Sequence, residues 1–123
     1  MNQFRLDELV IEARPLKMEG KLRVDWRGKS SAREPTRVLL PFFESVARDA
    51  AASKASMEMH FEGIEHFNSS TITAIIHLIQ LMRKQGTPLV LIYDPEQKWQ
   101  RLSFEALRVF EKGDGLLRIE TVS

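Results

Sequence analysis

The chain has 123 residues, of which 43% are hydrophobic and 28% are charged, a composition typical of soluble globular proteins. We expect a single domain, residues 1–123, because this length supports one hydrophobic core. The formal net charge of +1 gives no electrostatic basis for binding nucleic acid or an anionic membrane. The absence of cysteine excludes disulfides, thiol catalysis and cysteine-based metal sites. No apolar run approaches the ~20 residues of a membrane span, and the N-terminus does not resemble a signal peptide, so we expect a cytoplasmic protein.

The first third of the sequence predicts short strands. Residues 9–13 form an apolar run that Arg14 and Pro15 are expected to interrupt. Apolar and charged residues then alternate through residues 16–26, the period of a half-buried strand. The Gly at position 20 suggests a tight turn within this segment, so it is predicted to be a hairpin. Residues 27–31 are predicted to be a polar loop.

A helix should follow, because apolar side chains recur at helical spacing between residues 39 and 50. Pro35 suits a first helical turn, whereas Pro41 removes a hydrogen bond from a helix interior. The helix therefore either starts near Pro41 or is kinked there. It should end within residues 50–54.

The middle of the chain predicts a strand at residues 57–61 and a second helix at residues 70–84. One stripe of this helix is the expected core face, formed by Ile72, Ile75, Ile76, Ile79 and Met82. Ala74, Leu78 and Leu81 widen the apolar arc. Either this wider arc is wedged between the sheet and a neighbouring helix, or it forms a partly exposed shoulder that contacts a partner.

The last third begins where Gly86 and Pro88 should stop the second helix. Residues 89–93 form a continuous apolar run typical of a central strand. Residues 94–96 should cap a last helix, and residues 116–122 should form a closing strand. Strands that alternate with helices predict an α/β fold, with a mixed, mostly parallel sheet of about five strands and three main helices packed against it.

Residues 68–71 place one amide and three hydroxyl side chains where the second helix begins. Such side chains favour an N-cap, because an oxygen atom can accept an unpaired N–H of the first turn. The same position suits a phosphate, which the free N–H groups and the helix dipole would stabilise. The turn is therefore either a cap alone or a cap combined with a phosphorylation switch.

Three segments resemble the STAS domain, the fold of bacterial anti-sigma-factor antagonists. Residues 67–70 resemble the family's apolar-Asp-Ser-Ser signature at a strand-to-helix turn. Residues 88–93 resemble the strand after the family's second helix. Residues 98–104, together with residues 115–119, resemble its last helix and final strand. The resemblance covers the C-terminal half well, whereas the N-terminal half agrees only in the order of its elements.

The turn departs from the family pattern in two places, since Asn68 replaces the usual Asp and Thr71 replaces the usual Gly. The Asn, the loop at residues 28–30, and Pro35 followed by residues 42–43 are similar to the SiaC-like group. That group consists of STAS-like bacterial regulators that are phosphorylated on a hydroxyl and bind a diguanylate cyclase.

The resemblance implies a non-enzymatic signalling module without cofactors. In the family, a partner-switching serine kinase phosphorylates the first hydroxyl of the turn, and a PP2C-type phosphatase restores the unmodified form. Carried over by position, that hydroxyl belongs to Ser69, followed by Ser70 and Thr71. The unmodified protein would bind an anti-sigma factor and so regulate transcription, or would bind a diguanylate cyclase. The expected partner-binding residues are Asn68, Ser69, Ser70, Thr73, Ala74, His77, Leu78 and Leu81.

Other sites have weaker support in the sequence. The spacing of His60, His66 and His77 fits no common zinc motif, so no metal site is expected. A serine of the turn and His66 do not lie in a Gly-x-Ser-x-Gly elbow, so we expect no catalytic residues. Residues 28–30 lack the upstream Gly of a phosphate-binding loop. A second hypothesis is a small-ligand-binding module or structural subunit without a covalent switch, distinguished by an apolar pocket between sheet and helices. A homodimer through a sheet edge or helix face is compatible with either hypothesis.

Overall fold

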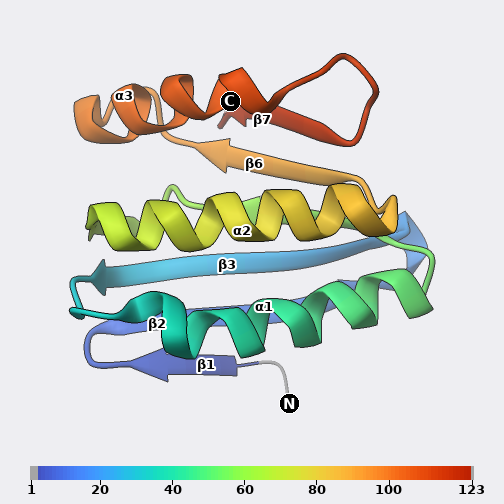
Figure 1. The fold of residues 1–123 in the computed structure, drawn as a ribbon, viewed down its shortest axis with the longest axis horizontal. Helices are drawn as coiled ribbons and strands as arrows, with labels where there is room; N and C mark the ends of the chain where they lie inside the picture. Colours follow the sequence, from blue (N-terminus) through green and yellow to red (C-terminus); the bar gives the residue numbers. More distant parts are fainter. Residues whose placement is uncertain (1–2, 123) are drawn as a thin grey trace.

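The computed structural model describes residues 3–122, which form a seven-stranded mixed sheet and three α-helices (Figure 1). The strands are β1 (Gln3–Leu6), β2 (Leu9–Leu16), β3 (Lys21–Ser30), β4 (Ser56–His60), β5 (Ile64–Phe67), β6 (Leu89–Tyr93) and β7 (Leu117–Thr121). Their order is β1-β2-β3-β4-β6-β7, with β5 paired to β3; the pairs β1–β2 and β2–β3 are antiparallel and the others are parallel. The predicted fold class is confirmed, although the sheet has seven strands rather than about five.

The three helices are α1 (Pro35–Ala52), α2 (Ser69–Gln85) and α3 (Lys98–Leu107), and their apolar sides meet the apolar face of the sheet. Alternate residues of the central strands, including Val24, Met59 and Leu91, are fully buried on that face. On α3, the ring of Phe104 stacks on Tyr93, with centroids 5.3 Å apart and planes 7° apart. Figure 1 shows α1 and α2 side by side, with both N-termini at the end of the sheet where β3 finishes.

The hairpin of β2 and β3 is longer than predicted, because β2 continues through Pro15 to Leu16. Pro15 is tolerated because β1 pairs only with residues 9–12 of β2, so the missing N–H removes no hydrogen bond to that neighbour. The turn is a short 3-10 helix, η1 (Lys17–Glu19), closed by Gly20 in the left-handed region. The predicted interruption at residues 14–15 is therefore wrong, whereas the predicted turn is confirmed.

The polar loop predicted at residues 27–31 is also wrong, because β3 runs on to Ser30. Its register shifts between Gly28 and Lys29, and its last residues pair with β5 instead of β4. Gly28 has a φ of +90°, and a Cβ atom there would lie 1.9 Å from the backbone oxygen of Glu8. Only glycine fits this conformation and this close approach. The strands β4 and β5 thus pair one after the other along the same edge of β3.

The helix ends resolve the alternatives left open by the sequence. α1 begins at Pro35 and includes Pro41 in its interior, on the exposed side. α2 ends at Gln85, and the Gly86 that follows has a φ of +74° as expected for a C-cap. α3 begins after Gln97 rather than at Asp94, whose carboxylate instead accepts a hydrogen bond from the Glu96 N–H at 3.0 Å. In the described part of the chain, no helix is long and apolar enough to cross a membrane.

The other face of the sheet carries charged side chains, as the alternation in β3 and β4 predicts. Glu58 lies between the ring of His60, at 2.7 Å, and the ammonium of Lys21, at 3.0 Å. Burial by itself would raise the pKa of Glu58, but the hydrogen bonds from His60 and Lys21 outweigh it and hold this pKa below its usual value. The carboxylate of Glu58 on this face is therefore stabilised by its two specific partners, Lys21 and His60.

Candidate functional site

The turn before α2 is organised by Asn68, which is the N-cap of the helix. Its side-chain oxygen accepts hydrogen bonds from the Thr71 N–H, at 3.0 Å, and from the Thr71 hydroxyl, at 2.8 Å. Its amide nitrogen donates to the backbone oxygen of Ala32 at 2.8 Å, and its N–H donates to the oxygen of Ser30 at 3.0 Å. Asn68 therefore joins the start of α2 to the segment that leads from β3 into α1.

A buried hydroxyl pair completes this arrangement. The hydroxyl oxygens of Ser30 and Thr71 are 2.7 Å apart, and their residues are 2% and 0% exposed. Each hydroxyl thus has a partner inside the structure, as buried polar groups require. Sequence reasoning did not identify Ser30 as part of the site, because it lies 41 residues from Thr71 and no local pattern connects them. We call Ser30, Asn68 and Thr71 the cap cluster.

Thr71 was expected as the third candidate for phosphorylation, and its burial contradicts that expectation. Its side chain is enclosed, and its hydroxyl is hydrogen-bonded within the cap cluster. A kinase could reach this oxygen only if the start of α2 opened. Thr71 is consequently a structural residue of the turn.

The two serines of the turn are placed differently. Ser69 is exposed and Ser70 is half-buried. Within residues 3–122, neither serine hydroxyl makes a hydrogen bond. The backbone oxygens of Ser69 and Ser70 accept from the hydroxyls of Thr73 and Thr36 respectively. The cap cluster satisfies the helix terminus without them. Capping therefore does not account for the two serine hydroxyls.

The remaining expected partner-binding residues divide into two sides of α2. The side that runs from Ser70 to Gln85 packs against α1, with hydrogen bonds to α1 at both ends. Ala74 and Leu78 lie on this side and are 0% exposed, so the expectation that they contact a partner directly is wrong. Leu81 is half-buried beside them. The wider apolar arc is thus wedged against α1, which is the first of the two predicted alternatives.

The side of α2 turned away from the sheet faces solvent and forms an exposed row at helical spacing. We call it the outer row, and it consists of Ser69, Thr73, His77 and Gln80. Ile72 and Ile76, expected to be core residues, are only half-buried along its edge. The accessible surface behind the turn therefore combines small polar groups with a margin of aliphatic carbon.

The segments beside the turn carry charged side chains of both signs. Lys29 at the end of β3, Arg33 before α1 and Arg37 in its first turn are all exposed. Among the described residues none of these three forms an ion pair. Carboxylates lie in the same region, on Glu34, on Glu65 and on Glu8, whose backbone oxygen accepts from the Lys29 N–H at 3.4 Å. The N-terminus of α2 itself favours a negative group at the turn.

The three histidines lie in three separate parts of the fold. His60 lies on the charged face of the sheet, and His77 lies in the outer row. His66, on β5, packs against the ring of Trp99 with centroids 5.9 Å apart. Across residues 3–122, no hydrogen bond joins His66 to either serine, and no cluster of three potential metal ligands is present.

Comparisons with known proteins give a match only among solved structures. A scan against protein-family models found no match, and a search of curated protein sequences found no significant match. Among solved structures, the fold is similar to a chain in the crystal structure of diguanylate cyclase SiaD in complex with its activator SiaC from Pseudomonas aeruginosa. The TM-score is 0.64 at 16% sequence identity, and the alignment covers 99% of this chain and 100% of the other. At this identity, the match establishes a shared fold.

Proposed function

We propose that this chain is a non-catalytic regulator that binds a protein partner through the turn at Asn68 and the outer row of α2. Phosphorylation of Ser69 is proposed to release that partner. The observation that carries the proposal is the division of the turn: the cap cluster holds the helix start, whereas Ser69 is exposed with an unbonded hydroxyl. The shared fold with a chain of the SiaD–SiaC complex supports a diguanylate cyclase, rather than an anti-sigma factor, as the class of partner.

The switch follows from electrostatics. The unmodified outer row is small and uncharged around Ser69, so a partner can bury it at little desolvation cost. A phosphoryl group adds about −1.5 to −2 charges and three acceptor oxygens. The N-terminus of α2 stabilises such a group in the free protein by up to about 2 kcal/mol. Burying the same group in an interface without matching cations costs several times more, so the complex is disfavoured.

Ser69 is preferred to Ser70 because of where each side chain points. Ser69 belongs to the exposed outer row, whereas Ser70 is half-buried on the side that faces α1. A phosphate on Ser70 would crowd the contact between the two helices before it met a partner. We therefore assign the partner-dependent switch to Ser69 and regard Ser70 as the secondary acceptor.

The test begins with protein isolated from the cells in which it naturally occurs. Tandem mass spectrometry is expected to place a single phosphoryl group on Ser69 and none on Thr71. Binding of the unmodified protein to the diguanylate cyclase of the same cells is then measured by isothermal titration calorimetry. Ser69→Ala should retain affinity and resist modification, whereas Ser69→Asp should weaken binding by about tenfold or more.

A matched control variant introduces the same negative charge at a different surface position. Thr121→Asp changes an exposed residue of β7, away from α2, and should leave the affinity unchanged within about twofold. The proposal is wrong if no phosphate is found on Ser69 or Ser70. It is also wrong if the phosphorylated protein binds the cyclase as tightly as the unmodified protein.

A further inference from the structure

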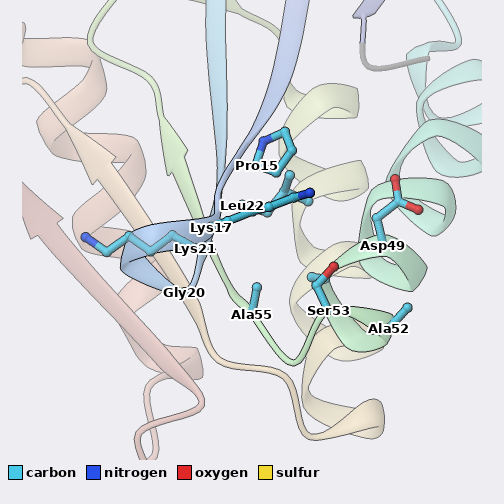
Figure 2. Close-up of a pocket in the computed structure, with 10 residues that line it drawn as sticks. Pro15, Lys17, Gly20, Lys21, Leu22, Asp49, Ala52, Ser53 and Ala55 are labelled. Carbon is cyan, nitrogen blue, oxygen red and sulfur yellow. The ribbon is translucent and has the colours of Figure 1, made fainter.

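A cavity of about 400 Å³ opens at the end of the molecule opposite the turn. It lies between the η1 end of the β2–β3 hairpin and the carboxyl end of α1 (Figure 2). β3 starts beside this cavity at Lys21 and ends beside the turn at Ser30, a span of ten residues or roughly 30 Å. The cavity is therefore separate from the proposed partner-binding surface, and its volume falls within the range of small-molecule sites.

The floor of the cavity is apolar. Pro15 and Leu22 line it from the hairpin, and Ala50 and Ala55 line it from the end of α1 and the segment that follows. Leu22, Ala50 and Ala55 are packed into the core over most of their surface. The few atoms that they present to the cavity are therefore held in place. A second hollow adjoins it and shares Ala50 and Ala55. An apolar group of a ligand would thus rest on preformed walls.

A positive and a negative side chain line the cavity from its two sides, Lys17 from the hairpin and Asp49 from α1. Figure 2 shows the ammonium group of Lys17 extending from η1 toward the helices, and the carboxylate of Asp49 on α1. Lys21, in contrast, points away from the cavity and pairs with Glu58 at 3.0 Å. Within residues 3–122, neither Lys17 nor Asp49 forms an ion pair. Both charges remain free to meet a ligand.

The end of α1 strengthens the case for a bound cation near Asp49. The last turn of α1 contains no basic residue, and Lys54 follows directly after its C-cap, Ser53. Asp49 adds a full negative charge close to the negative end of the helix dipole, which is an unfavourable position for a carboxylate. An ammonium group in the cavity would offset that charge.

We propose that this cavity binds a small zwitterion with an apolar body, of the α-amino-acid class. The ligand's ammonium group would lie near Asp49 and the end of α1, and its carboxylate would lie near Lys17. Its side chain would rest on Leu22 and Ala55. Recognition of both charges excludes simple amines and simple carboxylates, each of which leaves one wall of the cavity unpaired.

The experiment follows backbone amide signals by two-dimensional NMR while the full chain is titrated separately with L-leucine, L-methionine and L-phenylalanine. At least one of these probes should cause saturable shifts confined to residues 15–22 and 49–55, while the signals of residues 68–71 stay in place. Lys17→Gln and Asp49→Asn should each weaken the binding by about tenfold. Glu44→Gln, which neutralises an exposed carboxylate elsewhere on α1, should leave it unchanged.

Two analogues of leucine test the requirement for both charges. Isoamylamine lacks the carboxylate and isocaproate lacks the ammonium group, so each should bind at least about tenfold more weakly than leucine. The proposal is overturned if none of the three amino acids gives saturable shifts. It is equally overturned if binding persists at full affinity in both cavity variants, or if either analogue binds as tightly as leucine.

Discussion

Replacing Asn68 by Ala tests whether the cap cluster, rather than the serines, holds the start of α2. The change removes the N-cap oxygen that accepts from the Thr71 N–H and hydroxyl, and it leaves the oxygen of Ala32 without its donor. Loss of an N-cap side chain costs about 1 kcal/mol, and loss of a partly buried hydrogen bond costs about another 1 kcal/mol. We therefore expect Asn68→Ala to lower the free energy of unfolding by about 2 kcal/mol.

Urea unfolding at neutral pH, followed by far-ultraviolet circular dichroism, measures this difference. Ser69→Ala is the matched control, since Ser69 makes no side-chain hydrogen bond and should change the free energy of unfolding by less than about 0.5 kcal/mol. Asn68→Ala should lower the free energy of unfolding clearly more than Ser69→Ala. If the two substitutions lower it by the same amount, the cap cluster does not hold the helix start independently of Ser69, and the division of the turn is refuted.

Asn68→Asp separates the two functions of the side chain. A carboxylate still accepts from the Thr71 N–H and is favoured by the helix dipole, but it cannot donate to the oxygen of Ala32. We expect a loss of about 1 kcal/mol, intermediate between the parent protein and Asn68→Ala. A variant as stable as the parent would contradict this expectation and would mean that the gain from the helix dipole offsets the lost bond to Ala32.

Two further changes test the sheet. Gly28→Ala places a Cβ against the backbone oxygen of Glu8 at a φ of +90° and should destabilise by about 3 kcal/mol in urea unfolding, whereas Gly113→Ala, with a φ of +69° and open space around it, should cost only about 1 kcal/mol. Equal losses would refute the steric explanation. Because the pKa of Glu58 is lowered in the folded protein, its charge stabilises the fold at neutral pH, and this contribution is lost as the pH falls through that pKa. Glu58→Gln should therefore cost about 1 kcal/mol at neutral pH and progressively less as the pH falls through the lowered pKa of Glu58, and a difference that is constant with pH would contradict the assigned pairing with His60 and Lys21.

The sequence predicts those parts of the fold whose causes are local. The periodicity of α2, the continuous apolar run of β6 and the helix-ending Gly86 are visible within a few residues of the chain. The end of β3 and the whole of β5 were missed because they depend on pairing between distant segments. Residues 64–67 are buried only at their two ends, so β5 shows no alternation that would mark it as a strand.

The candidate site divides in the same way. The sequence places a cap within residues 68–71, because such side chains favour a helix start, but it does not single out Asn68. Only the family resemblance separates Ser69 from Ser70. The sequence does not show which flank of α2 meets α1, since the apolar arc is wide enough for either orientation, and so Ala74 and Leu78 were placed at the surface. Nor does it connect Ser30 with Thr71, whose contact exists only once β3 and α2 are assembled.

The rigidity of the cap cluster determines what kind of switch the turn can support. Asn68 uses both its oxygen and its amide nitrogen, and Thr71 is fully enclosed, so the backbone around Ser69 is fixed by groups that phosphorylation does not touch. A phosphate on Ser69 therefore changes the charge of the outer row without changing its shape, and a partner should sense that charge directly. A phosphate on Ser70 would instead act through the neighbouring helix, because the backbone oxygen of Ser70 is already tied to Thr36 of α1. The two adjacent serines are thus expected to differ in mechanism: modification of Ser69 should weaken partner binding at constant stability, whereas modification of Ser70 should lower stability as well.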